Sequence, residues 1–349
     1  TKALVDNPVS GQARKTYGTD VLVNILNEAG GLPTRNFRFG RFAGADKISG
    51  ETMREIILQR NGKTHHACHA GCVMQCSQVY NDKDGNYVTS GFEYETIWGF
   101  GANCCIDDLD IIAEADHRLD DIGVDSIETA VAVGVAMEAG ILPFGDGAGT
   151  LRLIEEIREG TPLGRILGSG AAAVGRMYGV TRVPVVKNQG LPAYDPRPVK
   201  GMGITYATST MGADHTAGYC IPLNILRIGG FVDPLRKEGE VDLSRRLQIG
   251  TAMIDSAGLC IFVMFPMLDN LDVFSLMFDM INAKYDLQMT ADDGRTLGRK
   301  ILRAEHAFNM AAGFTNKQDR LPEFFEEPIA PHNAVWDFTS EEIDSYWGV

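Results

Sequence analysis

The chain has 349 residues, of which 44% are apolar and 22% are charged, so it is long enough for two domains that share a large core. Its formal net charge is −14 and no block of lysine and arginine stands out, which argues against nucleic acid and anionic membrane surfaces as partners. The longest apolar run, residues 259–268, is too short to span a bilayer, and no signal peptide opens the sequence, so we expect no membrane span and a cytoplasmic location.

Most of the chain has the apolar spacing and the end signals of helices. Apolar residues recur at helical spacing over residues 18–30 and 107–123, and a glycine ends each segment. A third helix is predicted over residues 125–140, beginning at a cap residue, Asp125 or Ser126. Similar patterns predict further helices at residues 149–160, 163–179, 243–258 and 293–313.

Strand signals are scarce along the chain. Residues 81–90 could form a hairpin, with Asp84 and Gly85 in its turn. We therefore expect a mainly α, multihelical fold with at most a small hairpin. The proline- and glycine-rich passage 183–203 divides the chain near its middle, which predicts two helical domains, at residues 1–190 and 191–349.

The seven cysteines are an odd number, and they are not spread like a disulfide framework. Three of them, Cys68, Cys72 and Cys76, lie four residues apart within the stretch HHACHAGCVMQCSQ. In a large acidic chain without an export signal, this pattern favours metal or redox chemistry over disulfides. The neighbouring histidines are expected to tune such a site through hydrogen bonds rather than to bind the metal.

Three thiolates on a short turn, with a fourth supplied from a distant segment, are a common way to hold a [4Fe–4S] cluster. Zinc is the competing metal, although zinc fingers usually show two separated pairs of ligands. A third interpretation is that these cysteines are buried and bind nothing.

Two short segments repeat one pattern, an aspartate followed by a glycine three residues later, an aliphatic residue, and then aspartate or cysteine. They are DDIGVD at residues 120–125 and DSAGLC at residues 255–260. Taken singly, each pattern predicts a helix that ends at glycine and is followed by a polar cap for the next element. The second segment also supplies Cys260 as the candidate fourth thiolate.

Together these segments resemble the aldehyde:ferredoxin oxidoreductases, tungsten or molybdenum enzymes with a bis-pyranopterin cofactor and one [4Fe–4S] cluster. The resemblance covers essentially the whole chain, and its motifs follow one another in the family's order. They are residues 17–37, the cysteine triplet, and residues 91–104, 114–125, 212–218, 255–260 and 321–328. The family usually spaces its triplet Cys-x2-Cys-x3-Cys, so the loop in this chain is one residue longer.

In that family two pterins flank one metal, and one aspartate–glycine motif holds each pterin. The resemblance implies that one pterin is bound by Asp120, Gly123 and Asp125, and the other by Asp255, Gly258 and Leu259. It implies that the cluster ligands are Cys68, Cys72, Cys76 and Cys260.

The resemblance also implies two catalytic side chains. Glu95, rather than Glu93, would assist the attack of water or a metal-oxo group on the carbonyl carbon of an aldehyde. His215 would hydrogen-bond the carbonyl oxygen. The product would be a carboxylate, and two electrons would leave through the cluster to ferredoxin or to an iron–sulfur partner subunit.

Full members of the family carry a β-rich domain before the region that this sequence matches. The resemblance implies that this missing N-terminal domain completes the cofactor cavity, in cis or as a separate subunit. The chain alone would then expose an apolar groove. We expect the groove to be lined by Glu95, Asp120, His215 and Asp255.

Several assignments stay open at this point. Glu114 and His117 share a helical face and could bind a metal between the two copies of a homodimer, although a solvated ion-pair face is the simpler interpretation. Cys104 or Cys105 could reach the cofactor metal or could fill a small buried space. Two other functions remain as alternatives: an iron–sulfur electron-transfer subunit without pterin chemistry, and a non-catalytic helical scaffold.

Overall fold

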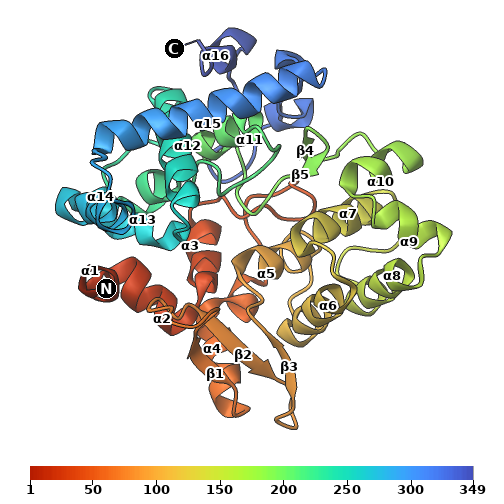
Figure 1. Ribbon diagram of the computed structural model, residues 1–349. Helices are drawn as coiled ribbons and strands as arrows, with labels where there is room; N and C mark the ends of the chain where they lie inside the picture. Colours follow the sequence, from red (N-terminus) through yellow and green to blue (C-terminus); the bar gives the residue numbers. More distant parts are fainter. Residues whose placement is uncertain (349) are drawn as a thin grey trace.

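The computed structural model describes residues 1–348 and shows a mainly helical protein, as the sequence predicted (Figure 1). The N-terminal part contains α1 (Lys2–Asp6), α2 (Arg14–Tyr17), α3 (Leu22–Glu28) and α4 (Gly50–Gln59). A central group of helices follows in α5 (Tyr94–Phe100), α6 (Leu109–Ile122), α7 (Ser126–Glu138), α8 (Gly147–Glu159), α9 (Pro162–Leu167) and α10 (Ala171–Tyr178). The C-terminal group is α11 (Lys200–Thr208), α12 (Glu240–Ser256), α13 (Met264–Asp269), α14 (Leu271–Tyr285), α15 (Ala291–Ala311) and α16 (Ser340–Asp344).

The predicted hairpin forms, but it belongs to a larger sheet than the sequence indicated. Strands β2 (Ser77–Asn81) and β3 (Tyr87–Ser90) pair antiparallel, and Asp82 closes their turn by accepting from the backbone N–H groups of Asp84 and Asn86. A third strand, β1 (Lys63–His66), pairs with the other edge of β2. The prediction of at most a small hairpin was therefore too narrow. Strand β1 was not predicted because its four residues are all polar and show no alternation of apolar and polar side chains.

A second small ribbon lies in the proline- and glycine-rich passage. Strands β4 (Val185–Val186) and β5 (Gln189–Gly190) are joined by Lys187 and Asn188, which both have positive φ, at 51° and 68°. This is the turn that best matches the twist of two paired strands. Residues 190–203 then run through the interior, and buried apolar side chains form one connected cluster from Leu22 to Tyr346. The division into domains 1–190 and 191–349 stays a prediction.

Most predicted helices appear near their expected bounds. Helix α7 begins after Asp125, whose carboxylate accepts from the Glu128 N–H at 2.6 Å, and it is buried on all sides, as an apolar helix should be. The segment 163–179 is the exception, because it breaks into α9 and α10 at residues 168–170, where Gly170 has a φ of 88°. Within residues 1–348 no single helix is long and apolar enough to cross a membrane, whereas one bent pair, Glu240–Ser256 with Ile261–Asp269, reaches that length and composition together.

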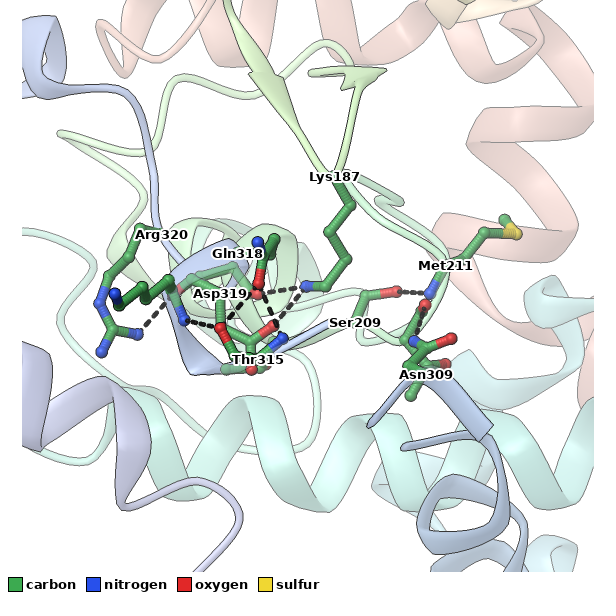
Figure 2. Close-up of polar contacts among 12 residues, drawn as sticks. Lys187, Ser209, Met211, Asn309, Thr315, Gln318, Asp319 and Arg320 are labelled. Carbon is green, nitrogen blue, oxygen red and sulfur yellow. Dashed lines mark hydrogen bonds and ion pairs between the residues drawn. The ribbon is translucent and has the colours of Figure 1, made fainter. Parts of the chain in front are cut away.

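The C-terminal segment is tied to the β4–β5 ribbon by a buried ion pair (Figure 2). The Lys187 ammonium lies 2.6 Å from the Asp319 carboxylate and also donates to the carbonyl of Ala207, the penultimate residue of α11. The Trp347 indole N–H donates to the same carboxylate at 3.2 Å. These contacts fix the point from which the chain leaves α11 toward residues 209–219.

Candidate metal and cofactor site

The cysteine triplet lies on the connection between the paired strands β1 and β2, which hold both ends of the loop. Positive φ angles at Gly71 and Gln75, 83° and 49°, let the loop turn sharply. The Cys68 sulfur, a ring nitrogen of His69 and the Cys72 sulfur all lie within 4.8 Å of one another. The short loop therefore presents two thiols and an imidazole to one point near its surface.

The distant Cys260, after α12, comes to the same place. Burial raises the pKa of Cys76 to about 12, with further contributions from Glu93, Cys260, Cys72 and Cys68. Burial likewise raises the pKa of the Cys68 thiol, and Cys72 and Cys260 add to the shift. Cys72 and Cys260 thus lie close enough to Cys68 and Cys76 to oppose the ionisation of those two thiols. A bound metal centre would reverse that effect, since its positive charge favours thiolates.

The two aspartate–glycine motifs adopt matching backbone conformations at the ends of α6 and α12. Gly123 and Gly258 both have left-handed φ, 77° and 69°. In each motif the next backbone N–H returns to the carbonyl five residues earlier, from Val124 to Leu119 at 3.2 Å and from Leu259 to Ile254 at 3.1 Å. This is the Schellman motif at a helix C-terminus, which several helices of the chain share. Each motif therefore ends its helix at a glycine, as its sequence predicted when taken singly.

The equivalence extends to the last residue of each motif. Asp125 and Cys260 both have extended backbone, with φ of −65° and −66°, and each begins the next helical turn. The Asp125 carboxylate accepts from the Glu128 N–H, and the Phe262 N–H lowers the pKa of Cys260 against the effect of burial. Both residues thus occupy the N-cap position of the next helical element, and only the Asp125 side chain makes a capping hydrogen bond.

Asp255 opens onto a cavity of about 660 Å³ beside α12 and α15. Burial raises the pKa of Asp255, and Asp214 adds to the shift, so the two carboxyl groups lie near each other. Met211 and Phe308 line the cavity and are 63% and 72% exposed, which leaves apolar surface at its rim. Asp120 is exposed at the end of α6 and, like Glu95, is not part of this cavity, so a single groove containing all four predicted residues stays a prediction.

Glu95 and His215 face each other. Their nearest atoms, Oε1 and Nε2, are 3.4 Å apart, and the other oxygen of Glu95 accepts from the Ala193 N–H at 2.9 Å. Among the described residues Glu95 Oε1 has no hydrogen-bond partner. Burial raises the pKa of Glu95, while His215 and the Ala193 N–H oppose the shift. Such a carboxyl group can exchange a proton at a pH above the usual range for glutamate.

The neighbouring glutamate has a different environment. Glu93 accepts from the Thr19 hydroxyl at 2.6 Å, and burial raises its pKa to about 7. It lies beside Cys76, whose pKa it raises, and beside the buried Asp20. The structure thus separates the two glutamates that the sequence offered: Glu95 faces the imidazole, and Glu93 supports the cysteine loop.

The remaining sequence candidates lie elsewhere. Cys104 is fully buried and contacts α7, while Cys105 opens to another cavity beside Arg35. Glu114 pairs with Arg118 one turn later at 2.8 Å, which matches the ion-pair interpretation of that helix face.

Sequence reasoning missed two tyrosines near His215. The rings of Tyr194 and Tyr219 lie 6.0 and 6.3 Å from the imidazole, centroid to centroid, and their hydroxyls are 3.0 Å apart. Tyr194 was not predicted because it lies in the proline- and glycine-rich passage 183–203, which the sequence indicates as a domain boundary. Asp214 was not predicted because the motif at residues 212–218 drew attention only to its histidine, His215.

Known proteins and a family model are similar to this chain over most of its length. A family model described as aldehyde ferredoxin oxidoreductase, domains 2 and 3, matches residues 1–348. A tungsten-containing aldehyde ferredoxin oxidoreductase of Thermococcus kodakarensis is 38% identical over 344 residues, covering 93% of this chain and 55% of that protein. A protein of the same description from Pyrococcus horikoshii is also 38% identical, over 348 residues, with the same coverage of 93% and 55%. The chain thus spans about half the length of these relatives.

A solved structure shares the fold at low sequence identity. It is an active-site complex of benzoyl coenzyme A reductase with 1,5-dienoyl-CoA, with a TM-score of 0.66 and 13% identity. The match covers 94% of this chain and 56% of that one.

Proposed function

Because the chain belongs to the aldehyde ferredoxin oxidoreductase family, of which it represents domains 2 and 3, we propose that it forms the cluster- and cofactor-binding part of a tungsten or molybdenum enzyme that oxidises an aldehyde to a carboxylate. The observation that carries the proposal is that the thiol following the second aspartate–glycine motif, Cys260, meets the cysteine loop. One chain segment would thereby supply both a cluster ligand and a pterin contact.

The residues present fit both groups. The thiols of Cys68, Cys72, Cys76 and Cys260 would hold a [4Fe–4S] cluster. The motifs at 120–125 and 255–260 would each hold one pterin, since exposed carboxylates accept hydrogen bonds from the ring N–H groups and a glycine lets the backbone approach closely. When bound at these residues, the metal and its pterins would supply two-electron redox chemistry, and the cluster would supply a path for electron transfer.

The chain's own side chains handle the proton and position the substrate. Glu95 Oε1 has no other hydrogen-bond partner among the described residues, so it is free to accept a proton from the attacking oxygen. His215, which lies beside two tyrosine rings and 3.4 Å from that oxygen, would donate to the carbonyl oxygen of the aldehyde. The buried surroundings strengthen both interactions because they exclude water.

The partners follow from the part of the relatives that this chain covers. We infer that a further domain, in cis or as a separate subunit, closes the cofactor cavity beside Asp255. Electrons would pass to ferredoxin or to an iron–sulfur subunit, and a homodimer remains compatible with the family.

The test is anaerobic purification followed by analysis of iron, sulfide, tungsten, molybdenum and pterin. We expect about four iron atoms per chain and a broad iron–sulfur absorbance band. Cys260→Ser should lose both, whereas Cys220→Ser, which changes a fully buried thiol hydrogen-bonded to Gly218, should keep them. A zinc-bound protein would refute the proposal, and iron–sulfur without any pterin or tungsten would favour a purely electron-transferring subunit.

A further inference from the structure

His215 has a carboxyl group on the side of each of its ring nitrogens. Its Nε2 atom is 3.4 Å from Glu95 Oε1, and its Nδ1 atom is 4.0 Å from Oδ1 of the preceding residue, Asp214. All three side chains are largely buried. The proposed function uses Glu95 and His215 but assigns no role to Asp214.

The Asp214 carboxylate is anchored beside the ring. Its Oδ1 atom accepts from both the backbone N–H and the hydroxyl of Thr216, each at 2.8 Å. The separation of 4.0 Å from Nδ1 is an ion-pair contact that is longer than a hydrogen bond, and catalytic contacts of this kind tighten when substrate binds. The segment from Asp214 to Thr216 therefore presents a fixed oxygen to the Nδ1 side of the ring.

A negative charge on Asp214 decides which ring nitrogen carries the proton. An ionised carboxylate accepts hydrogen bonds but cannot donate one, so a lone pair on Nδ1 would face a negative charge. A proton on Nδ1 turns this contact into an attraction. The lone pair of the neutral ring then lies on Nε2, on the side of Glu95.

This arrangement bears on how Glu95 could act as a base. Burial raises the pKa of Glu95, and the nearby Asp214 adds to the shift, so Glu95 holds its proton to a higher pH than an exposed glutamate. A protonated carboxyl group cannot accept the proton of an attacking oxygen. Transfer of its proton to Nε2 would break the O–H bond at Oε1 and form an N–H bond, which leaves a carboxylate beside an imidazolium with a proton on each nitrogen.

We propose that Asp214 is a positioning residue for the proposed reaction, which keeps a proton on Nδ1 of His215 and stabilises the imidazolium that forms when Nε2 takes the proton of Glu95. The inference rests on the proposed function. The Glu95 carboxylate can then accept a proton from the attacking oxygen, while Nε2–H donates to the carbonyl oxygen of the aldehyde. A buried aspartate orients a catalytic histidine and stabilises its imidazolium in the same way in the serine proteases.

The first experiment locates the proton on the ring. The full chain is labelled with ¹⁵N at its seven histidines, and ring ¹H–¹⁵N correlation spectra are recorded at pH 7 with any cluster in its oxidised state. The signal that disappears in His215→Gln belongs to His215. We expect a proton on Nδ1 in the wild-type protein and a smaller fraction of such rings in Asp214→Ala, since no carboxylate would then face Nδ1.

The second experiment measures turnover in the same variants. Asp214→Ala should lower kcat by about 10²–10⁴-fold with little change in KM, because Asp214 acts on the ring and not on the substrate. Asp214→Asn should lose less, since the Thr216 donors hold its remaining oxygen toward the ring. The matched control is Asp233→Ala, which removes a carboxylate that accepts from the N–H two residues later, as Asp214 does, but pairs with Arg236. It should leave the ring proton and kcat unaltered.

The two readouts separate positioning from a merely structural role. A wild-type ring without a proton on Nδ1, or the same fraction of Nδ1–H in Asp214→Ala, would overturn the inference even if kcat fell. If Asp214→Ala does not fold, wild-type kcat in Asp214→Asn would overturn it equally. Absence of pterin and tungsten from the wild-type protein would instead refute the proposed function, and the spectra would still show whether Asp214 holds the ring.

Discussion

The buried ion pair between Lys187 and Asp319 should be a large and measurable source of stability. The two side chains are only 5% and 7% exposed, and their charged atoms are 2.6 Å apart. With an effective dielectric constant of 20, the attraction at that distance is roughly 6 kcal/mol before desolvation is subtracted. Removing one partner leaves the other charge buried and typically costs about 3–5 kcal/mol.

The perturbation is Lys187→Met, which keeps the aliphatic stem and removes the ammonium. Among the described residues, Asp319 would then keep only the Trp347 indole as a side-chain donor. We expect the free energy of unfolding, measured by chemical denaturation at pH 7, to fall by about 3–5 kcal/mol. Adding Asp319→Asn should recover about 2 kcal/mol relative to the sum of the single changes, since the two groups interact directly.

The exposed pair of Lys47 and Asp107 provides the matched control. Its atoms are 2.5 Å apart, but the side chains are 67% and 47% exposed, so Lys47→Met should cost less than about 1 kcal/mol. If Lys187→Met were no more destabilising than Lys47→Met, or if the double variant were simply additive, the argument from burial would be wrong.

Three further outcomes are expected. Glu95→Gln should lower turnover by about 10²–10⁴-fold with metal content unchanged. Because burial raises the pKa of Glu95, the wild-type activity should fall as the pH drops through a value above the usual range for glutamate. A fall in activity only within the usual range would contradict this prediction. Asp255→Asn should reduce bound pterin and tungsten, while Asp242→Asn, on the exposed first turn of the same helix, should not; equal contents in both would count against the second motif. Burial raises the pKa of Asp116 to about 6, so the folded state holds this proton more tightly than the unfolded state. The free energy of unfolding should therefore decrease as the pH rises from about 4 to 6. Asp116→Asn should flatten that part of the stability profile, and an unchanged profile would exclude Asp116 as the cause of the decrease.

The helical character of the fold could be predicted because its signals are local. A glycine after an apolar face predicts the ends of α6 and α12, and Asp125 predicts the N-cap of α7. Strand β1 could not be found this way, since pairing with β2 and not its own pattern makes it a strand. The break between α9 and α10 depends on two neighbouring glycines whose effect a periodicity argument underestimates.

The candidate site was predictable only as far as its residues carry distinctive chemistry. A cysteine triplet and a repeated motif can be recognised along the chain, and the structure brings Cys260 to the loop at 68–76. Tyr194 and Tyr219 carry no such signature. Their relevance comes from burial and from distances between segments far apart in sequence, which no local pattern encodes.

The buried carboxyl groups and thiols of this region bear on why the chain would bind the proposed cluster and cofactor. Burial raises the pKa of several groups in this region. They are the carboxyl groups of Asp20, Glu93, Glu95 and Asp255 and the thiols of Cys68, Cys76 and Cys260. Each such group opposes folding at neutral pH, because its charged form has lost water without gaining a full partner. In a chain with a formal net charge of −14, a set of buried acids beside four thiols would be removed by selection for stability alone. We propose that these acids are retained because a proton-transferring reaction uses them, and Glu95, which faces His215, is the acid to which the proposed function assigns that role.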